Sequence, residues 1–101
     1  MNISEVLMVR IYIAESSNSL KKIADYLKHE AKVRGITVFR AIEGFGETGA
    51  HTAGFLDLSL DLPLVIEFFD EDKVKVEKAL THLNTLVKAK HIVMWNARVN
   101  I

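Results

Sequence analysis

Residues 6–14 read VLMVRIYIA, and this stretch limits how the rest of the chain can fold. Every second residue is apolar, which is the period of two expected of a strand that packs one face on a core. The apolar face comprises Leu7, Val9, Ile11 and Ile13. The other face carries Met8, Arg10 and Tyr12, which together are too apolar for open water although one of them is charged. We therefore predict a strand whose second face is covered by something other than the chain's own helices.

Two segments have the periodicity of amphipathic helices. In the first, apolar residues between Leu20 and Ala31 recur at spacings of three and four, and Gly35 is expected to supply the left-handed turn that ends the helix. The second opens at residues 70–72, which are Asp-Glu-Asp and suit a helix N-terminus, and closes at residues 88–90, which are Lys-Ala-Lys. We predict one helix in each segment.

The remaining segments alternate or are rich in β-branched and aromatic residues, which predicts strands over residues 37–43, 55–60, 64–69 and 92–99. No linker rich in Pro, Gly or Ser divides residues 1–101, so a single domain is expected. The order of elements favours the ferredoxin-like βαββαβ arrangement. This is an α+β sandwich in which two helices cover one face of an antiparallel sheet.

The other face of such a sheet has no helices of its own to cover it. Met8, Tyr12 and either Val93 or Met94, with one alternate set of residues from the middle strands, would form an apolar patch there. Apolar patches larger than a few hundred Å² usually mark an interface. We therefore expect the chain to form a closed homo-oligomer.

Composition and charge exclude several classes of protein. Lys and Arg number 13 and Asp and Glu number 13, so the net charge is zero, and we expect no nucleic-acid partner. The absence of cysteine excludes disulfides, thiolate metal sites and cysteine nucleophiles. No apolar run reaches the roughly 20 residues that cross a bilayer, and the N-terminus does not resemble a secretory signal. We expect no membrane span and a cytoplasmic location.

The glycine-rich segment from residue 44 to residue 54 is the one most suited to function. Its first six residues match the G-x-G-x-x-G dinucleotide fingerprint, and Asp70 lies about twenty residues further on. The fingerprint needs a helix directly after the glycines, whereas residues 55–60 alternate as a strand does, so we attribute the match to chance. A loop that turns backbone amides toward an anion, or that contacts a partner, remains open beside a plain hairpin connection.

Histidines are spread along the chain. His51 lies in the glycine-rich segment beside Thr52, where its imidazole could donate to a phosphate or bind a metal. His29, His82 and His91 lie on or beside the helices at spacings that do not form a ligand set. We therefore expect no metal site.

Three arginines, Arg10, Arg40 and Arg98, fall within predicted strands. One interpretation is that they pair across the sheet with Glu43 or Glu67. The alternative is that one or more of them reaches a cleft between subunits and neutralises a bound anion, together with the lysines at positions 88 and 90.

Evidence for catalysis is limited to the carboxylates Glu43 and Glu47 near His51, which could form an acid and base set. Their spacing is not diagnostic, and no serine lies in a nucleophile elbow. We expect a protein that is not an enzyme. A small enzyme or metal-handling protein that uses these residues is the alternative, and a purely structural partner-binding oligomer is a third hypothesis.

Four segments together resemble those of the PII-like superfamily of trimeric signalling proteins, and most closely the family called domain of unknown function 190. They are residues 10–15 (RIYIAE), residues 38–46 (VFRAIEGFG), the pair at positions 51 and 52 (HT), and residues 60–67 (LDLPLVIE). The likeness covers nearly the whole chain. It implies a PII-like fold and a homotrimer that binds adenine nucleotides or other small molecules in clefts between subunits.

The resemblance also implies roles for two segments. Gly44 and Gly46 correspond to the base of a loop that reports to partner proteins, and residues 88–90 correspond to a phosphate-contacting loop. Residues 88–90 lack the glycine-rich stretch that nitrogen-regulatory PII proteins have there. The reporter loop, residues 44–54, has no tyrosine for uridylylation. The resemblance therefore implies a class of behaviour rather than one ligand.

We accordingly predict a cytoplasmic regulatory protein that binds a small anionic ligand, with an adenine nucleotide as one candidate, and that reports through residues 44–54. No obligatory cofactor is expected. The expected partners are two further copies of the chain, the ligand, and a protein that contacts the loop. The expected ligand-binding residues are Arg40, Gly44, Phe45, Gly46, His51, Thr52, Lys88, Lys90 and Arg98.

Overall fold

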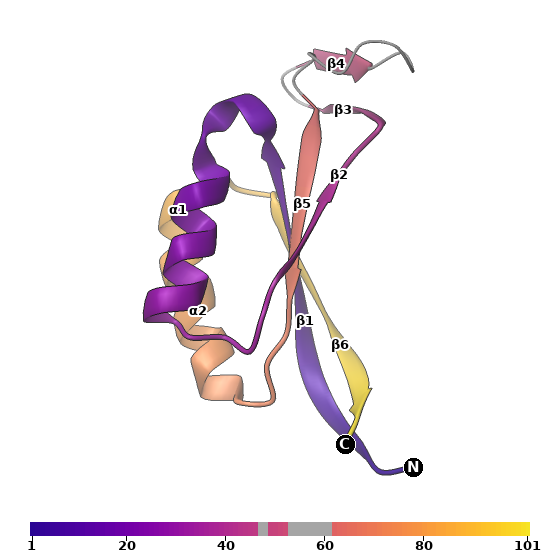
Figure 1. Cartoon of the computed structure of the whole chain (residues 1–101), viewed down its shortest axis with the longest axis vertical. Coiled ribbons are helices and arrows are strands. Elements are labelled where there is room, and N and C mark those ends of the chain that lie inside the picture. Colours follow the sequence, from indigo (N-terminus) through magenta and orange to yellow (C-terminus); the bar gives the residue numbers. More distant parts are fainter. Residues whose placement is uncertain (47–48, 53–61) are drawn as a thin grey trace.

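The computed structural model describes residues 1–46, 49–52 and 62–101 of the chain. Figure 1 shows two layers, which are a sheet and, on one side of it, the helices. The elements in chain order are β1 (Ile3–Ala14), η1 (Glu15–Ser17), α1 (Ser19–Asp25), η2 (Tyr26–Glu30), β2 (Thr37–Arg40), β3 (Glu43–Gly46), β4 (Gly49–Thr52), β5 (Pro63–Phe68), α2 (Lys73–Leu86) and β6 (Ile92–Asn100). Among these, η1 is a 3-10 turn and η2 is a π-helical turn that continues α1.

The main sheet has the strand order β2-β5-β1-β6, and every neighbouring pair is antiparallel. With two helical segments on one face, this is the ferredoxin-like α+β fold, so the predicted fold class is confirmed. β3 and β4 form a separate two-stranded ribbon, which lies beyond one end of the main sheet in Figure 1.

The core lies between the sheet and the helices. Val9 and Ile11 of β1 are fully buried there with Ile66 of β5, as the alternation of the sequence predicts. Ile23 of α1 and Leu83 of α2 are also fully buried in this cluster. The helices are therefore held to the sheet by apolar burial on one face only.

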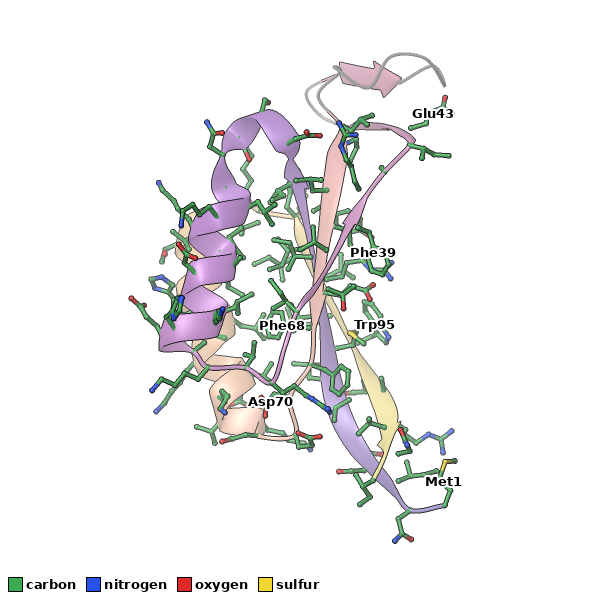
Figure 2. All side chains as sticks on the ribbon, viewed as in Figure 1. Met1, Phe39, Glu43, Phe68, Asp70 and Trp95 are labelled. Carbon is green, nitrogen blue, oxygen red and sulfur yellow. The ribbon has the colours of Figure 1, made fainter. Side chains whose placement is uncertain are left out.

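The opposite side of the main sheet, which we call the outer face, carries no helix. Met8 pairs with Trp95, and Val65 pairs with both Tyr12 and Phe39, so these side chains share that face. In Figure 2, Phe39 and Trp95 point away from the helices, whereas Phe68 points toward them. Phe39 is 50% exposed and Trp95 is 39% exposed. The predicted apolar patch is therefore present on the single chain.

The first helical segment ends earlier than predicted. Lys32, rather than Gly35, adopts the left-handed conformation, with φ of 55°. The backbone N–H of Val33 donates to the carbonyl of Leu27 at 3.0 Å, and Val33 packs against the core. This bond and the apolar contact of Val33 accompany the left-handed residue at the helix end, so packing of Val33 fixes where the chain turns.

The predicted strand over residues 37–43 is divided in the structure. β2 ends at Arg40, the backbone N–H of Ala41 donates to the carbonyl of Pro63 at 2.9 Å, and β3 then begins at Glu43. The ladder between β2 and β5 stops here because Pro63 has no N–H to continue it. The strand predicted at 55–60 lies outside the described residues.

The second helix begins and ends close to the predicted positions. The side chain of Asp72 accepts from the backbone N–H of Lys75 at 3.2 Å, which makes Asp72 the N-cap. The helix ends at Leu86, so Lys88 and Lys90 lie in the turn that follows it rather than in its last residues. None of the helices in the described part of the chain is long and apolar enough to cross a membrane.

Candidate functional site

One end of the main sheet gathers most of the predicted ligand-binding residues. β1 and β2 finish at this end, whereas β5 and β6 begin there. Backbone hydrogen bonds from Tyr12 to His91 at 2.9 Å and from Glu15 to Leu62 at 3.1 Å tie it together. We call it the loop end, because the β3–β4 ribbon lies beyond it in Figure 1.

Arg40 is the last residue of β2 and is held by a carboxylate. Its Nε donates to Glu15 Oε2 at 2.8 Å and its Nη2 donates to Glu15 Oε1 at 3.3 Å, so the contact is bidentate. Both side chains remain partly exposed. The predicted pairing of a strand arginine with Glu67 is confirmed for Arg10, and Arg40 contacts Glu15, which directly follows β1.

The β3–β4 ribbon forms the base of the predicted loop. Gly44 pairs with His51 and Glu43 pairs with Thr52, so part of the segment that was expected to be a loop forms a two-stranded ribbon. A Cβ atom on Gly44 would lie 3.0 Å from Cγ of Pro63, which is tighter than an ordinary carbon contact. The ribbon therefore approaches β5 closely at a position that suits glycine. Phe45 and Gly46 complete β3.

Lys88 and Lys90 lie in the turn between α2 and β6. Lys90 adopts the left-handed conformation with φ of 70°, which is uncommon for a residue with a side chain. The backbone N–H of His91 donates to the carbonyl of Lys88 at 3.2 Å, and its Nδ1 lies 3.0 Å from the carbonyl oxygen of Ala89. The turn is therefore compact, and both lysine side chains are exposed.

A shallow depression of about 350 Å³ lies beside this turn. Ile92 and Met94 of β6 contribute apolar surface, Thr81 and Asn84 of α2 contribute polar groups, and the two lysines lie at its margin. Such a surface can take a ligand that has an anionic group and a partly apolar body. Sequence reasoning missed Thr81 and Asn84, although positions 81 and 84 have the spacing of one helix face.

The predicted ligand-binding cations are separated in two directions, across the main sheet and along β6. β2, which ends at Arg40, and β6, which follows the turn of Lys88 and Lys90, are opposite edges of the sheet, so their backbones are about 14 Å apart at roughly 4.8 Å per strand spacing. Arg98 is further away, because it pairs with Glu5 whereas Ile92 begins the strand at the loop end. Six residues at about 3.3 Å each separate it from that end by roughly 20 Å. A single chain therefore does not bring these cations together.

The described residues offer little for catalysis. Glu47 lies outside them, and Glu43 and His51 are placed in the ribbon only by their backbone pairing. No group of three His, Cys, Asp or Glu residues that could hold a metal occurs in the part of the chain that is described. The clearest charged features of the loop end are thus Arg40 with Glu15 and the two lysines of the turn.

Comparisons with known proteins address the family and the fold. The model of the family DUF190, described as "Uncharacterized ACR, COG1993", matches residues 6–99. A "UPF0166 protein" of Aquifex aeolicus is 33% identical over 96 residues, which cover 90% of this chain and 87% of that protein. Both matches span almost the whole chain.

Solved structures agree on the fold. CPII of Thiomonas intermedia, bound to ADP and bicarbonate, matches with a TM-score of 0.62 at 14% identity over 99% of this chain and 91% of that one. A putative PII-like signaling protein of Thermus thermophilus matches with a TM-score of 0.63 at 19% identity, over 98% and 91% of the two chains. The chain therefore belongs to the DUF190 family and has the PII-like fold.

Proposed function

We propose that the protein is a PII-like homotrimeric regulator, rather than an enzyme. In this proposal it binds a small anionic ligand in clefts between subunits and changes the state of residues 44–54. The observation that carries the proposal is the position of the cations at the loop end. Arg40 lies at one edge of the sheet and Lys88 and Lys90 lie at the other, all at the same end.

Two edges at the same end meet when copies of the sheet stand side by side around an axis. The arginine of one copy then approaches the lysines of the next, and an anion between them is neutralised from both sides. Within a single chain the strands next to these groups are three spacings apart, or about 14 Å between backbones. In this proposal a second copy completes the site.

The ligand class follows from the charges and from the depression beside the turn. Lysines suit a phosphate or carboxylate, and Met94 and Ile92 suit an apolar or planar portion. The relative CPII is described with bound ADP and bicarbonate, which makes adenine nucleotides and bicarbonate the first ligands to test. Arg98, at the far end of β6, has no role in this cleft unless a neighbouring copy approaches that end.

The loop responds through Arg40 and Glu15 in this proposal. Arg40 precedes the outgoing end of the loop, and Glu15 holds the returning end through its bond to the carbonyl of Leu62. An anion that competes with Glu15 for the guanidinium loosens this bridge. Ligand binding then changes the geometry of both ends of the segment together.

Isothermal titration calorimetry of the assembled protein with ATP, ADP, AMP, cyclic nucleotides, phosphate and bicarbonate tests the proposal. The double variant Lys88→Ala/Lys90→Ala should bind at least tenfold more weakly, because each lost cation–anion contact is worth about 1.5–3 kcal/mol. Lys73→Ala, which removes an exposed lysine at the opposite end of α2, serves as the matched control and should bind normally. No response of the wild-type trimer to any of a broad metabolite panel would contradict ligand sensing.

The alternative function, a small enzyme or metal-handling protein that uses His51 with Glu43 or Glu47, is separated by one variant. His51→Ala should leave assembly and most ligand affinity intact in the regulator that we propose. Loss of turnover or metal uptake in this variant would favour the alternative. Hydrogen exchange of residues 41–52, with and without ligand, reports whether the base of the loop changes state.

A further inference from the structure

Charged side chains are nearly absent from the outer face. Among the strand positions of this face that the structure describes, the charges are those of Arg10 and Glu67, and they pair directly across β1 and β5. Their neighbours in the register are apolar or uncharged, such as Val93 opposite Arg10 and Thr37 opposite Glu67. The outer face is thus an apolar surface with one internally neutralised pair near its middle.

The pair is held firmly within the chain. Arg10 Nε donates to Glu67 Oε2 at 2.6 Å, and Arg10 Nη2 contacts the same oxygen. The guanidinium also lies over the ring of Trp95, with Cζ 5.2 Å from the centroid. The side chain of Arg10 is 38% exposed and that of Glu67 is 17% exposed, so the carboxylate is already partly withdrawn from water.

The charge pattern indicates what covers this face. When copies pack the same face around a symmetry axis, a net charge on it repels the same charge on its neighbours. Here each chain brings its own counter-ion, so copies can approach without any complementary charge from the partner. A protein of different sequence would be expected to complement an unpaired charge, and Arg10 and Glu67 leave none.

We infer that the Arg10–Glu67 pair is the specificity determinant that fixes how copies of this chain dock on their outer faces. The inference rests on the proposed homotrimer and adds the residues that select it. Apolar contacts around the pair supply attraction that does not depend on orientation. The pair, by contrast, limits how the copies can be oriented. Its remaining hydrogen-bonding groups lose contact with water when the faces pack, so only orientations that give these groups other partners are favourable.

This role differs from simple stabilisation, and variants can separate the two. Removal of one partner leaves a charge to be buried alone, so Arg10→Met or Glu67→Leu should weaken association by roughly a hundredfold or more. Replacement of both, in Arg10→Met/Glu67→Leu, removes the desolvation penalty and should retain or strengthen association. Without the pair, however, the double variant should populate several oligomeric species instead of one.

Sedimentation velocity and native mass spectrometry measure the species present in each protein. The matched control is Lys21→Met/Asp25→Leu, which removes an exposed ion pair with a 2.8 Å contact from α1 and should leave a single trimeric species. Far-ultraviolet circular dichroism and a urea titration establish that each variant is folded. The exchanged pair Arg10→Glu/Glu67→Arg gives up the contact of the guanidinium with Trp95 but keeps an ion pair between β1 and β5, so it should restore a single species.

The outcomes distinguish this inference from the assembly on which it rests. A wild-type protein that is monomeric at micromolar concentration overturns both, and then the outer face has another occupant. A trimeric wild type whose single and double variants all remain one trimeric species overturns the role of the pair alone. A double variant that dissociates as fully as the single variants also overturns it, because the pair would then supply affinity.

Discussion

Asp70 is the only charged residue that is buried among the described residues, with 6% exposure. Its Oδ2 accepts from the backbone N–H of Arg34 at 2.9 Å, and its Oδ1 accepts from that of Asp72 at 2.9 Å. Nζ of Lys75 lies 3.9 Å from Oδ2 of Asp70. The carboxylate therefore joins the turn that opens α2 to the segment that leads into β2, two parts of the chain that are far apart in sequence.

Replacement of Asp70 tests this bridge. Asp70→Ala leaves two backbone N–H groups without their acceptor, and we expect it to lower the free energy of unfolding by about 2–4 kcal/mol. Asp70→Asn keeps one acceptor oxygen and should lower the free energy of unfolding by less than Asp70→Ala does. Urea denaturation gives the values, with Asp72→Ala as the control, since loss of that N-cap costs about 1 kcal/mol. If Asp70→Ala proves no more costly than Asp72→Ala, the bridge is not a principal support of the fold.

At the scale of elements, the helices are joined by an aromatic contact. The rings of Tyr26, in the π-helical turn, and His82, in α2, stack with centroids 4.0 Å apart and planes inclined by 30°. Burial of the phenol raises the pKa of Tyr26, and the negative charge of Glu30 raises it further. The folded chain therefore holds the phenolic proton at a pH where the unfolded chain has lost it.

This shift predicts a loss of stability in alkali. The contribution of Tyr26 is fully present below the unfolded pKa of about 10 and is lost as the pH rises through the higher pKa of the folded protein. Tyr26→Phe should remove that part of the alkaline loss. The difference between the phenolate absorbance titrations of wild type and Tyr26→Phe isolates this group, and Glu30→Gln should move its pKa partly back. A pKa equal to that of free tyrosine would contradict the burial of the phenol.

Sequence alone predicted the elements whose signals are local. The alternation in β1, the acidic start of α2 and the βαββαβ order are confirmed because burial on one face dictates residue type at each period. The predicted end of the first helix was wrong because the position of this end depends on the packing of Val33 against the core, which is a tertiary contact. The division between β2 and β3 likewise depends on Pro63 arriving beside Ala41 from another part of the chain.

At the scale of the whole molecule, the candidate site is only partly predictable. Arg40 was proposed because it lies in a predicted strand, and Lys88 and Lys90 were proposed because they close a predicted helix. Their separation onto opposite edges follows from the strand order, and the remoteness of Arg98 follows from the register of β6 on β1. Neither this separation nor the remoteness of Arg98 can be predicted from the spacing of residues along the sequence. Glu15 was missed as the partner of Arg40 because the two residues meet only after β1 and β2 are placed in one sheet.

The single tryptophan offers a direct test of how copies meet. Trp95 lies on the outer face opposite Met8, and in the isolated chain the residue is 39% exposed. Assembly on this face removes the indole from water, so we expect its fluorescence to shift to longer wavelengths when dilution dissociates the protein. The emission of a concentration series, compared with sedimentation of the same samples, measures this shift.

The matched control moves the fluorophore to the helical layer, in the double variant Trp95→Phe/Val74→Trp. Val74 is an exposed residue of α2, and a tryptophan there should emit at one wavelength at every concentration, because the helices face away from the packed sheets. The two reporters then separate burial of the outer face from any general loosening of the chain. A wild-type emission that stays constant while sedimentation shows dissociation would mean that another surface joins the copies, since the indole cannot leave an interface without regaining contact with water.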